Sequence, residues 1–152
     1  MLDADVFLTN PNILNELISK NETVVAPLLK SDGLYSNFWA GMTDDFYYLR
    51  TEKYEPILFR EVKGCFNVPM IHSAVLIDLR KHNSDNLTYN PKNLNQYNGP
   101  IDDIITFAVS ANNSGKLMLC KVFTKFFKNF TFLSLIMFFF SPIYARCTAI
   151  YL

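Results

Sequence analysis

The strongest constraint on the fold is a change of composition after Cys120. Up to that residue charged, polar and apolar residues are mixed, whereas from Phe126 onwards the chain is rich in phenylalanine. Seventeen consecutive positions between Lys128 and Arg146 carry no charged side chain, which is the short limit for a helix that spans a bilayer. We therefore expect one domain over residues 1–120 and a separate apolar helix in a tail over residues 121–152.

Three interpretations of this tail stay open. It can be a read-through product without a selected role, an anchor that contacts a membrane through residues 129–145, or a core helix. Pro142 shortens the usable helix, because a proline in a helix interior removes a hydrogen bond and clashes with the preceding turn.

The first 120 residues alternate between strand-like and helix-like segments. Asn10 as N-cap and Pro11 at the first helical position predict a helix, and the acidic pair Asp102-Asp103 predicts the start of another. The expected strands or extended segments are 23–28, 35–42, 66–80 (broken by Pro69) and 116–120. The segment 44–63 is expected to be a long loop or an irregular hairpin, and 83–99 a surface loop. Such alternation indicates an α/β fold with a mixed sheet and flanking helices.

Charge and cysteine content exclude some classes of function. Fourteen basic and fourteen acidic residues give no net charge, and no basic cluster is interleaved with aromatic residues, so nucleic-acid binding is not expected. Three cysteines, Cys65, Cys120 and Cys147, cannot all pair within the chain, and their spacing matches no zinc motif.

The chain begins with an Asp-x-Asp pattern, Asp3-Ala4-Asp5. If this segment is a strand tip, alternation places both carboxylates on one face. Hard divalent cations prefer oxygen ligands, so Asp3 and Asp5 are candidate ligands of Mn²⁺ or Mg²⁺. A solvated turn explains the same pair without a metal.

Further short sequence blocks follow the Asp-x-Asp pattern, and the order of these blocks is more informative than any single block. They are Ala26-Pro27-Leu28-Leu29, Tyr35-Ser36-Asn37-Phe38-Trp39-Ala40-Gly41-Met42-Thr43, Gly64-Cys65-Phe66-Asn67-Val68-Pro69-Met70-Ile71-His72-Ser73, Leu76-Ile77-Asp78-Leu79-Arg80-Lys81 and Asp102-Asp103-Ile104-Ile105. Together they resemble glycosyltransferase family 25, the procollagen galactosyltransferases and the related cerebral endothelial cell adhesion molecule. The resemblance runs from about Leu2 to Cys120 and implies a partial GT-A-like nucleotide-sugar transferase domain.

The resemblance implies a function for intact relatives. They would transfer galactose from UDP-galactose to hydroxylysine of collagen, with Mn²⁺, in the lumen of the endoplasmic reticulum. Family members are longer and have two such modules, so this sequence is expected to be the latter part of the first module, with little or no activity alone. The alternative is a non-catalytic, adhesion-like or membrane-tethered remnant that binds a partner.

The resemblance also suggests roles for individual residues. Asp103 is a candidate catalytic base with Asp102 beside it, although helix capping explains both acids equally. The candidate sugar-binding residues are Trp39, Asn37, Tyr35 and His72. Trp39 is also explained as a core aromatic residue, and His72 as a hydrogen-bonded structural histidine.

Several features bear on the compartment. Sequons occur at Asn21, Asn86, Asn112 and Asn129, of which Asn21 and Asn86 are the expected glycosylation sites. Met1 to Asp5 has neither the basic start nor the apolar core of a signal peptide, so entry into the lumen by the usual route is not expected. Where the family has a cysteine after Asn-Phe-Trp, this chain has Ala40, so a bridge using that position would be lost.

Overall fold

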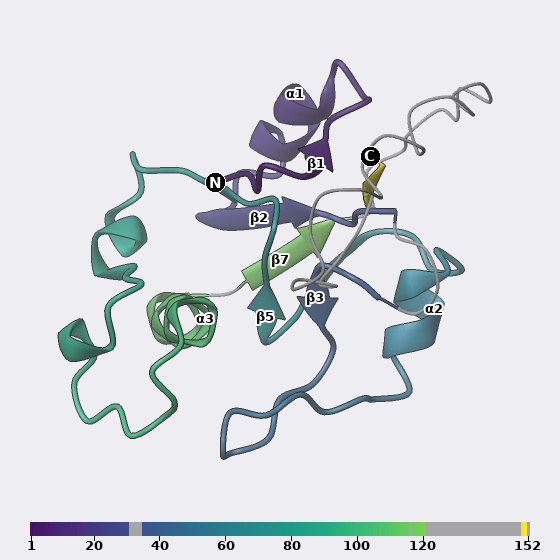
Figure 1. Cartoon of the computed structure of the whole chain (residues 1–152). Helices are drawn as coiled ribbons and strands as arrows, with labels where there is room; N and C mark the ends of the chain where they lie inside the picture. The colour runs from purple at the N-terminus through teal and green to yellow at the C-terminus, as the bar shows by residue number, and fades with distance from the viewer. Residues whose placement is uncertain (31–34, 116, 121–149, 152) are drawn as a thin grey trace, which may run out of the picture.

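The computed structural model describes residues 1–30, 35–115, 117–120 and 150–151. Its centre is a four-stranded sheet in the order β4-β7-β2-β6. β2 (Val24–Pro27) runs parallel to β7 (Leu117–Cys120) and antiparallel to β6 (Leu76–Ile77), and β4 (Cys65–Asn67) lies antiparallel to β7. Figure 1 shows β2 and β7 side by side in the middle of the molecule. The α/β fold with a mixed sheet is therefore confirmed.

β2 is buried on both faces, and its side chains pack into two hydrophobic clusters. Val24 and Ala26 point into the larger hydrophobic cluster, whereas Val25 points into a smaller one. This is the alternation that a strand imposes, and a strand covered on both sides has a nearly continuous apolar sequence. The run of apolar residues from Val24 to Leu29 thus specifies the central strand.

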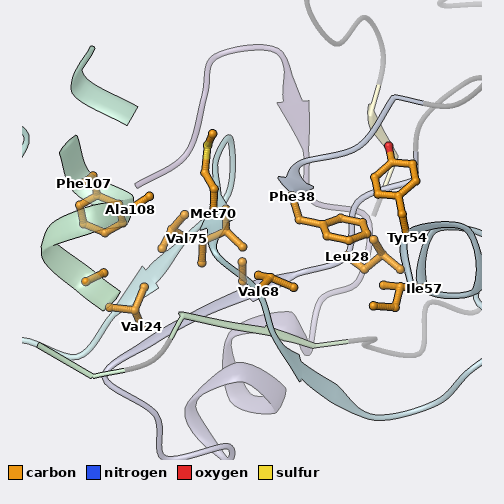
Figure 2. Packing of buried hydrophobic residues seen from close by; sticks show 13 residues of the cluster. Val24, Leu28, Phe38, Tyr54, Ile57, Val68, Met70, Val75, Phe107 and Ala108 are labelled. Carbon is orange, nitrogen blue, oxygen red and sulfur yellow. The ribbon is translucent and has the colours of Figure 1, made fainter. Parts of the chain in front are cut away.

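Helices cover both faces of this sheet. α1 (Ile13–Ile18) packs through Ile13 and Leu17 into the smaller cluster. α3 (Asp103–Ser114) and α2 (Tyr54–Leu58) pack into the larger cluster from opposite ends. Figure 2 shows Phe107 of α3 at one end of that cluster and Tyr54 of α2 at the other.

Short elements complete the described structure. β3 (Phe38–Trp39) pairs antiparallel with β5 (Met70–Ile71), and β1 (Val6–Phe7) pairs parallel with β8 (Ile150–Tyr151). Two 3₁₀ helices, η1 (His82–Asn86) and η2 (Pro91–Asn93), lie between β6 and α3.

Some sequence-based expectations need correction. The first helix begins at Ile13 rather than Pro11, and Asn10 instead accepts a hydrogen bond from the Asn12 amide at 2.9 Å and donates one to Glu16 at 3.0 Å. The segment 44–63, expected to be a loop or an irregular hairpin, contains α2, and an antiparallel bridge joins Tyr48 to Met42 before that helix. Its Pro56 lies in the first helical turn, where a missing N–H costs nothing.

The apolar helix expected in the tail lies outside the described residues, apart from the strand pairing of Ile150–Tyr151. Among the helices that the structure does describe, none combines the length and the hydropathy required to cross a bilayer.

Cys65, on the edge strand β4, is disulfide-bonded. The β4–β7 register places it directly opposite Cys120. Facing residues of an antiparallel pair have Cα atoms about 4.5 to 5.5 Å apart, which is within the range that a disulfide spans.

Candidate functional site

The N-terminal segment lies antiparallel to residues 73–75. Leu2 forms a bridge with Ala74, and the Asp3 N–H donates a hydrogen bond to the Ser73 carbonyl at 2.8 Å. This pairing brings Asp3 beside the block that contains His72, although the two are far apart in the sequence.

The carboxylates of Asp3 and Asp5 are not arranged by strand alternation. The Val6 N–H donates to the Asp3 carbonyl at 3.2 Å, so residues 3–6 form a turn that leads into β1. Asp3 is exposed and Asp5 half-buried. The expectation that both lie on one face of a strand is wrong, because the chain must reverse between its pairing with Ala74 and β1.

Tyr89 connects Asp3 with Asp103. Burial raises the pKa of the Tyr89 phenol, and the carboxylates of Asp103 and Asp3 raise it further. Its ring stacks on Phe107 of α3, with centroids 4.6 Å apart and an interplanar angle of 11°. The Tyr89 hydroxyl donates a hydrogen bond to the Met1 sulfur at 2.9 Å, which joins Tyr89 to the N-terminal segment that carries Asp3. We call the exposed residues Asp3, Tyr89 and Asp103 the acidic site.

His72 and Ser73 lie at the back of this site in a strained turn. The Ala74 N–H donates to the His72 carbonyl at 2.8 Å, and Ser73 between them has φ +66° and is 5% exposed. Non-glycine residues adopt this conformation rarely, and such strain is concentrated at functional sites. Nδ1 of His72 lies 2.8 Å from the Ser73 hydroxyl, so the turn fixes the imidazole.

The pKa of His72 predicts how stability depends on pH. Burial lowers this pKa below its usual 6.5, while the Asp3 carboxylate and a hydrogen bond to the Ser36 backbone act in the opposite direction. Just below pH 6.5 the unfolded chain therefore binds more protons than the folded chain, and stability rises with pH in that range. We expect the free energy of unfolding to decrease on acidification from pH 7, and to decrease less in His72→Gln.

The measurement is urea denaturation at several pH values in metal-free buffer. His82→Gln is the matched control, because His82 is exposed and paired only with Asp85. A pH profile of His72→Gln that follows the unmodified chain would contradict the assignment.

Asn37 does not face the site. It is 0% exposed, and its carboxamide accepts a hydrogen bond from the Leu29 N–H and donates to the carbonyls of Pro27 and His72. The sugar-binding role predicted for Asn37 therefore needs correction: these bonds tie the end of β2 to the β3–β5 pair, and the amide is not presented to a ligand.

The ring contacts in the described structure do not join Trp39 or Tyr35 to Tyr89. Trp39 is half-buried on β3 opposite Met70 and packs edge-on against Tyr48, with centroids 5.7 Å apart. It also packs against the larger cluster, as its interpretation as a core aromatic residue predicts. Tyr35 is 67% exposed. These contacts do not connect Trp39 or Tyr35 with the acidic site. The sugar-binding roles of Trp39 and Tyr35 therefore stay predictions.

The two acids at the start of α3 have different environments. Asp102 caps the helix by accepting a hydrogen bond from the Ile105 N–H at 2.9 Å, so its capping role is confirmed. Asp103 is exposed, and its carboxylate accepts from the adjacent Ile104 N–H. Of the pair, Asp103 is the one that acts on Tyr89 and is open to a ligand.

The acids of the described residues do not by themselves make up a complete metal site. Within the described part of the chain no three Asp, Glu, His or Cys side chains are grouped closely enough to hold one. No contact between the Asp3 and Asp5 carboxylates is seen in the described structure, so their binding of Mn²⁺ or Mg²⁺, with phosphate oxygens and water as the remaining ligands, stays a prediction.

The expected glycosylation sites Asn21 and Asn86 are both exposed. Asn112 is in α3 and its side chain donates to the Pro69 carbonyl at 2.8 Å, whereas Asn129 lies outside the described residues.

Sequence reasoning missed Tyr89 and Ser73. Tyr89 was in a segment expected to be only a surface loop, and its single signal was an aromatic residue among asparagines. Ser73 gave no signal, because nothing in its type predicts a positive φ.

Comparison with known proteins identifies relatives over most of the chain. The sequence profile of the glycosyltransferase family 25 N-terminal domain matches residues 1–133. A glycosyltransferase 25 family member of Aedes aegypti is 56% identical over 115 residues, covering 74% of this chain and 19% of the relative. Procollagen galactosyltransferase 1-A of Xenopus laevis is 53% identical (78% of this chain, 20% of the relative), and procollagen galactosyltransferase 2 of Homo sapiens is 52% identical (78% and 19%). The chain spans about a fifth of the length of these relatives.

Proposed function

Because this chain belongs to glycosyltransferase family 25, we propose that it forms part of a domain that transfers galactose from UDP-galactose to hydroxylysine of collagen. The observation that carries the proposal is the identity of about 50% to procollagen galactosyltransferases over 120 residues, and the exposed acids Asp3 and Asp103 are the groups that we assign to the reaction. In such a transfer a cation held by carboxylates can stabilise the departing diphosphate, and a further carboxylate can accept the proton of the acceptor hydroxyl.

Asp3 and Asp5 share one role in this proposal, and Asp103 has another. Asp3 and Asp5 would be the residues that hold Mn²⁺, and when bound that cation would neutralise the charge that develops on the departing diphosphate. Asp103, exposed at the start of α3, accepts the proton of the acceptor hydroxyl. Tyr89 holds the N-terminal segment that carries Asp3, because its hydroxyl donates to the Met1 sulfur at 2.9 Å.

The supporting residues act through these groups. The strained turn at Ser73 holds the N-terminal segment by accepting the Asp3 N–H, and it orients His72. Asn37 joins that turn to the central strand. Together they are the positioning residues of the site in this proposal.

The disulfide at Cys65 bears on localisation. Structural disulfides persist in oxidising compartments and are rare in the cytosol. This supports the proposal that the chain folds in the lumen of the endoplasmic reticulum, where collagen is modified in the family.

Calorimetric titration of the whole chain with UDP-galactose, with and without Mn²⁺, tests the proposal. We expect saturable binding only with Mn²⁺, weakened at least about tenfold in Asp3→Ala, since a lost ligand to a metal-bound diphosphate costs more than 1.4 kcal/mol. Asp44→Ala is the control, because Asp44 is equally exposed in the segment between β3 and α2. Absence of binding at millimolar ligand would overturn the proposal and favour the non-catalytic alternative.

A further inference from the structure

A second concave region lies on the other side of the segment that carries Tyr89. It has a volume of about 380 Å³ and is bordered by η1, η2 and the C-terminal half of α3. That volume is at the lower end of the range for small-molecule sites. In Figure 1 these two 3₁₀ helices lie beside α3, away from α2. Thr88 lines the cavity, whereas its neighbour Tyr89 stacks on Phe107.

The wall of this cavity is rigid. The Thr88 N–H donates to the Ser110 hydroxyl at 3.1 Å, and that hydroxyl donates to the Phe107 carbonyl at 2.8 Å. The Asn93 amide donates to the Thr88 hydroxyl at 3.2 Å. These bonds fix the loop to α3, so the cavity is preformed.

Three carboxamides on this wall are not used by the fold. Asn86, Asn95 and Asn113 come from η1, the segment after η2 and α3; all three are exposed, and their side chains form no hydrogen bond within the described part of the chain. A carboxamide offers two donors and an acceptor side by side, which matches the adjacent hydroxyl groups of a sugar. Leu87 and Leu94 add apolar surface for its C–H groups.

The lining excludes other ligand classes. No lysine or arginine borders the cavity, and Asp85 adds a negative charge, so an anion is disfavoured. The lining is too polar for an apolar ligand, and the described residues hold no metal-binding group of three acids, histidines or cysteines. A neutral, polyhydroxylated ligand satisfies all these conditions.

We propose that this cavity binds one unit of a neutral saccharide, at a site separate from Asp3, Tyr89 and Asp103. The proposal does not depend on the sugar-transfer function proposed above, because its geometry involves none of the acids assigned to donor or acceptor. In a domain that does transfer sugars, the site would hold a glycan close to the reacting groups.

Saturation-transfer NMR of the whole chain with methyl galactoside is the test. The chain is produced in a bacterial host that attaches no N-linked glycan, so that no glycan on Asn86 occupies the cavity and all three carboxamides stay in place. We expect saturation transfer that falls at least tenfold when Asn95→Ala and Asn113→Ala are combined, and that persists in Asn15→Ala, an exposed residue on α1.

Backbone amide shifts distinguish the sites. Shifts at residues 93–95 and 110–114 support the proposal, whereas shifts confined to Asp3, Tyr89 and Asp103 overturn it. Galactose 6-phosphate should bind more weakly than methyl galactoside because of Asp85, and stronger binding would overturn the assignment of a neutral ligand. No saturation transfer, or transfer unchanged in the double variant, overturns the site itself, while metal-dependent UDP-galactose binding is tested separately.

Discussion

Replacing Asn37 with alanine is expected to lower the free energy of unfolding by about 4 kcal/mol, because buried backbone groups left without partners cost about 1–3 kcal/mol each. The Leu29 N–H and the Pro27 carbonyl would both lose their partner inside the protein. Small domains are stable by only about 5–15 kcal/mol, so this one change removes a large share. Urea denaturation followed by circular dichroism measures it.

Asn37→Leu separates lost packing from lost hydrogen bonds. Leucine fills the space but leaves the same backbone groups unpaired, so it should be nearly as destabilising as alanine. Asn67→Ala is the matched control, since Asn67 is exposed on β4 and surface changes usually stay within about 0.5 kcal/mol. If Asn37→Leu were as stable as the unmodified chain, the structural role of Asn37 would be wrong.

Asn37 also shows why the candidate site could be predicted only in part. In the sequence, Ser36-Asn37-Phe38-Trp39 is compatible with an amide that binds a sugar and with one that binds backbone. The choice depends on Leu29, Pro27 and His72, which reach Asn37 only in the folded chain. Local sequence cannot decide between those two roles.

The elements with strong local signals were predicted correctly. The apolar run before Leu29 gave β2, and an acidic cap followed by apolar residues gave α3. α2 was missed because five residues containing a proline have no helical periodicity to detect.

The prediction that Asp3 and Asp5 lie on one face of a strand was wrong for a different reason. Two acids separated by one residue lie on one face only if the backbone is extended, and here the chain turns at Asp3 to leave its partner Ala74. The position of Asp3 beside the Ser73 turn comes from the β-bridge between Leu2 and Ala74, which no local pattern encodes.

Replacing Cys65 with serine is expected to destabilise the chain by about 4 kcal/mol, because a disulfide that closes a loop of this length restricts the unfolded state by roughly that amount. We predict that its partner is Cys120, which the β4–β7 register places opposite Cys65. β4 is at the edge of the sheet, where it pairs with β7, and its Phe66 packs against the larger cluster. The disulfide adds a covalent attachment to these contacts. Chemical denaturation with and without reducing agent gives the difference.

Identification of the disulfide-linked peptides by mass spectrometry, after alkylation of free thiols, tests the pairing. Cys147→Ser is the control, and it should leave both the stability and the Cys65–Cys120 peptide unchanged. A peptide that links Cys65 to Cys147 would show that the β4–β7 register does not determine the bridge. Equal stability of Cys65→Ser and the unmodified oxidised chain would show that the edge strand is held without it. If Cys65→Ser is destabilised as expected, the attachment of β4 depends on the disulfide and therefore on an oxidising environment. That dependence agrees with the proposed location in the endoplasmic reticulum.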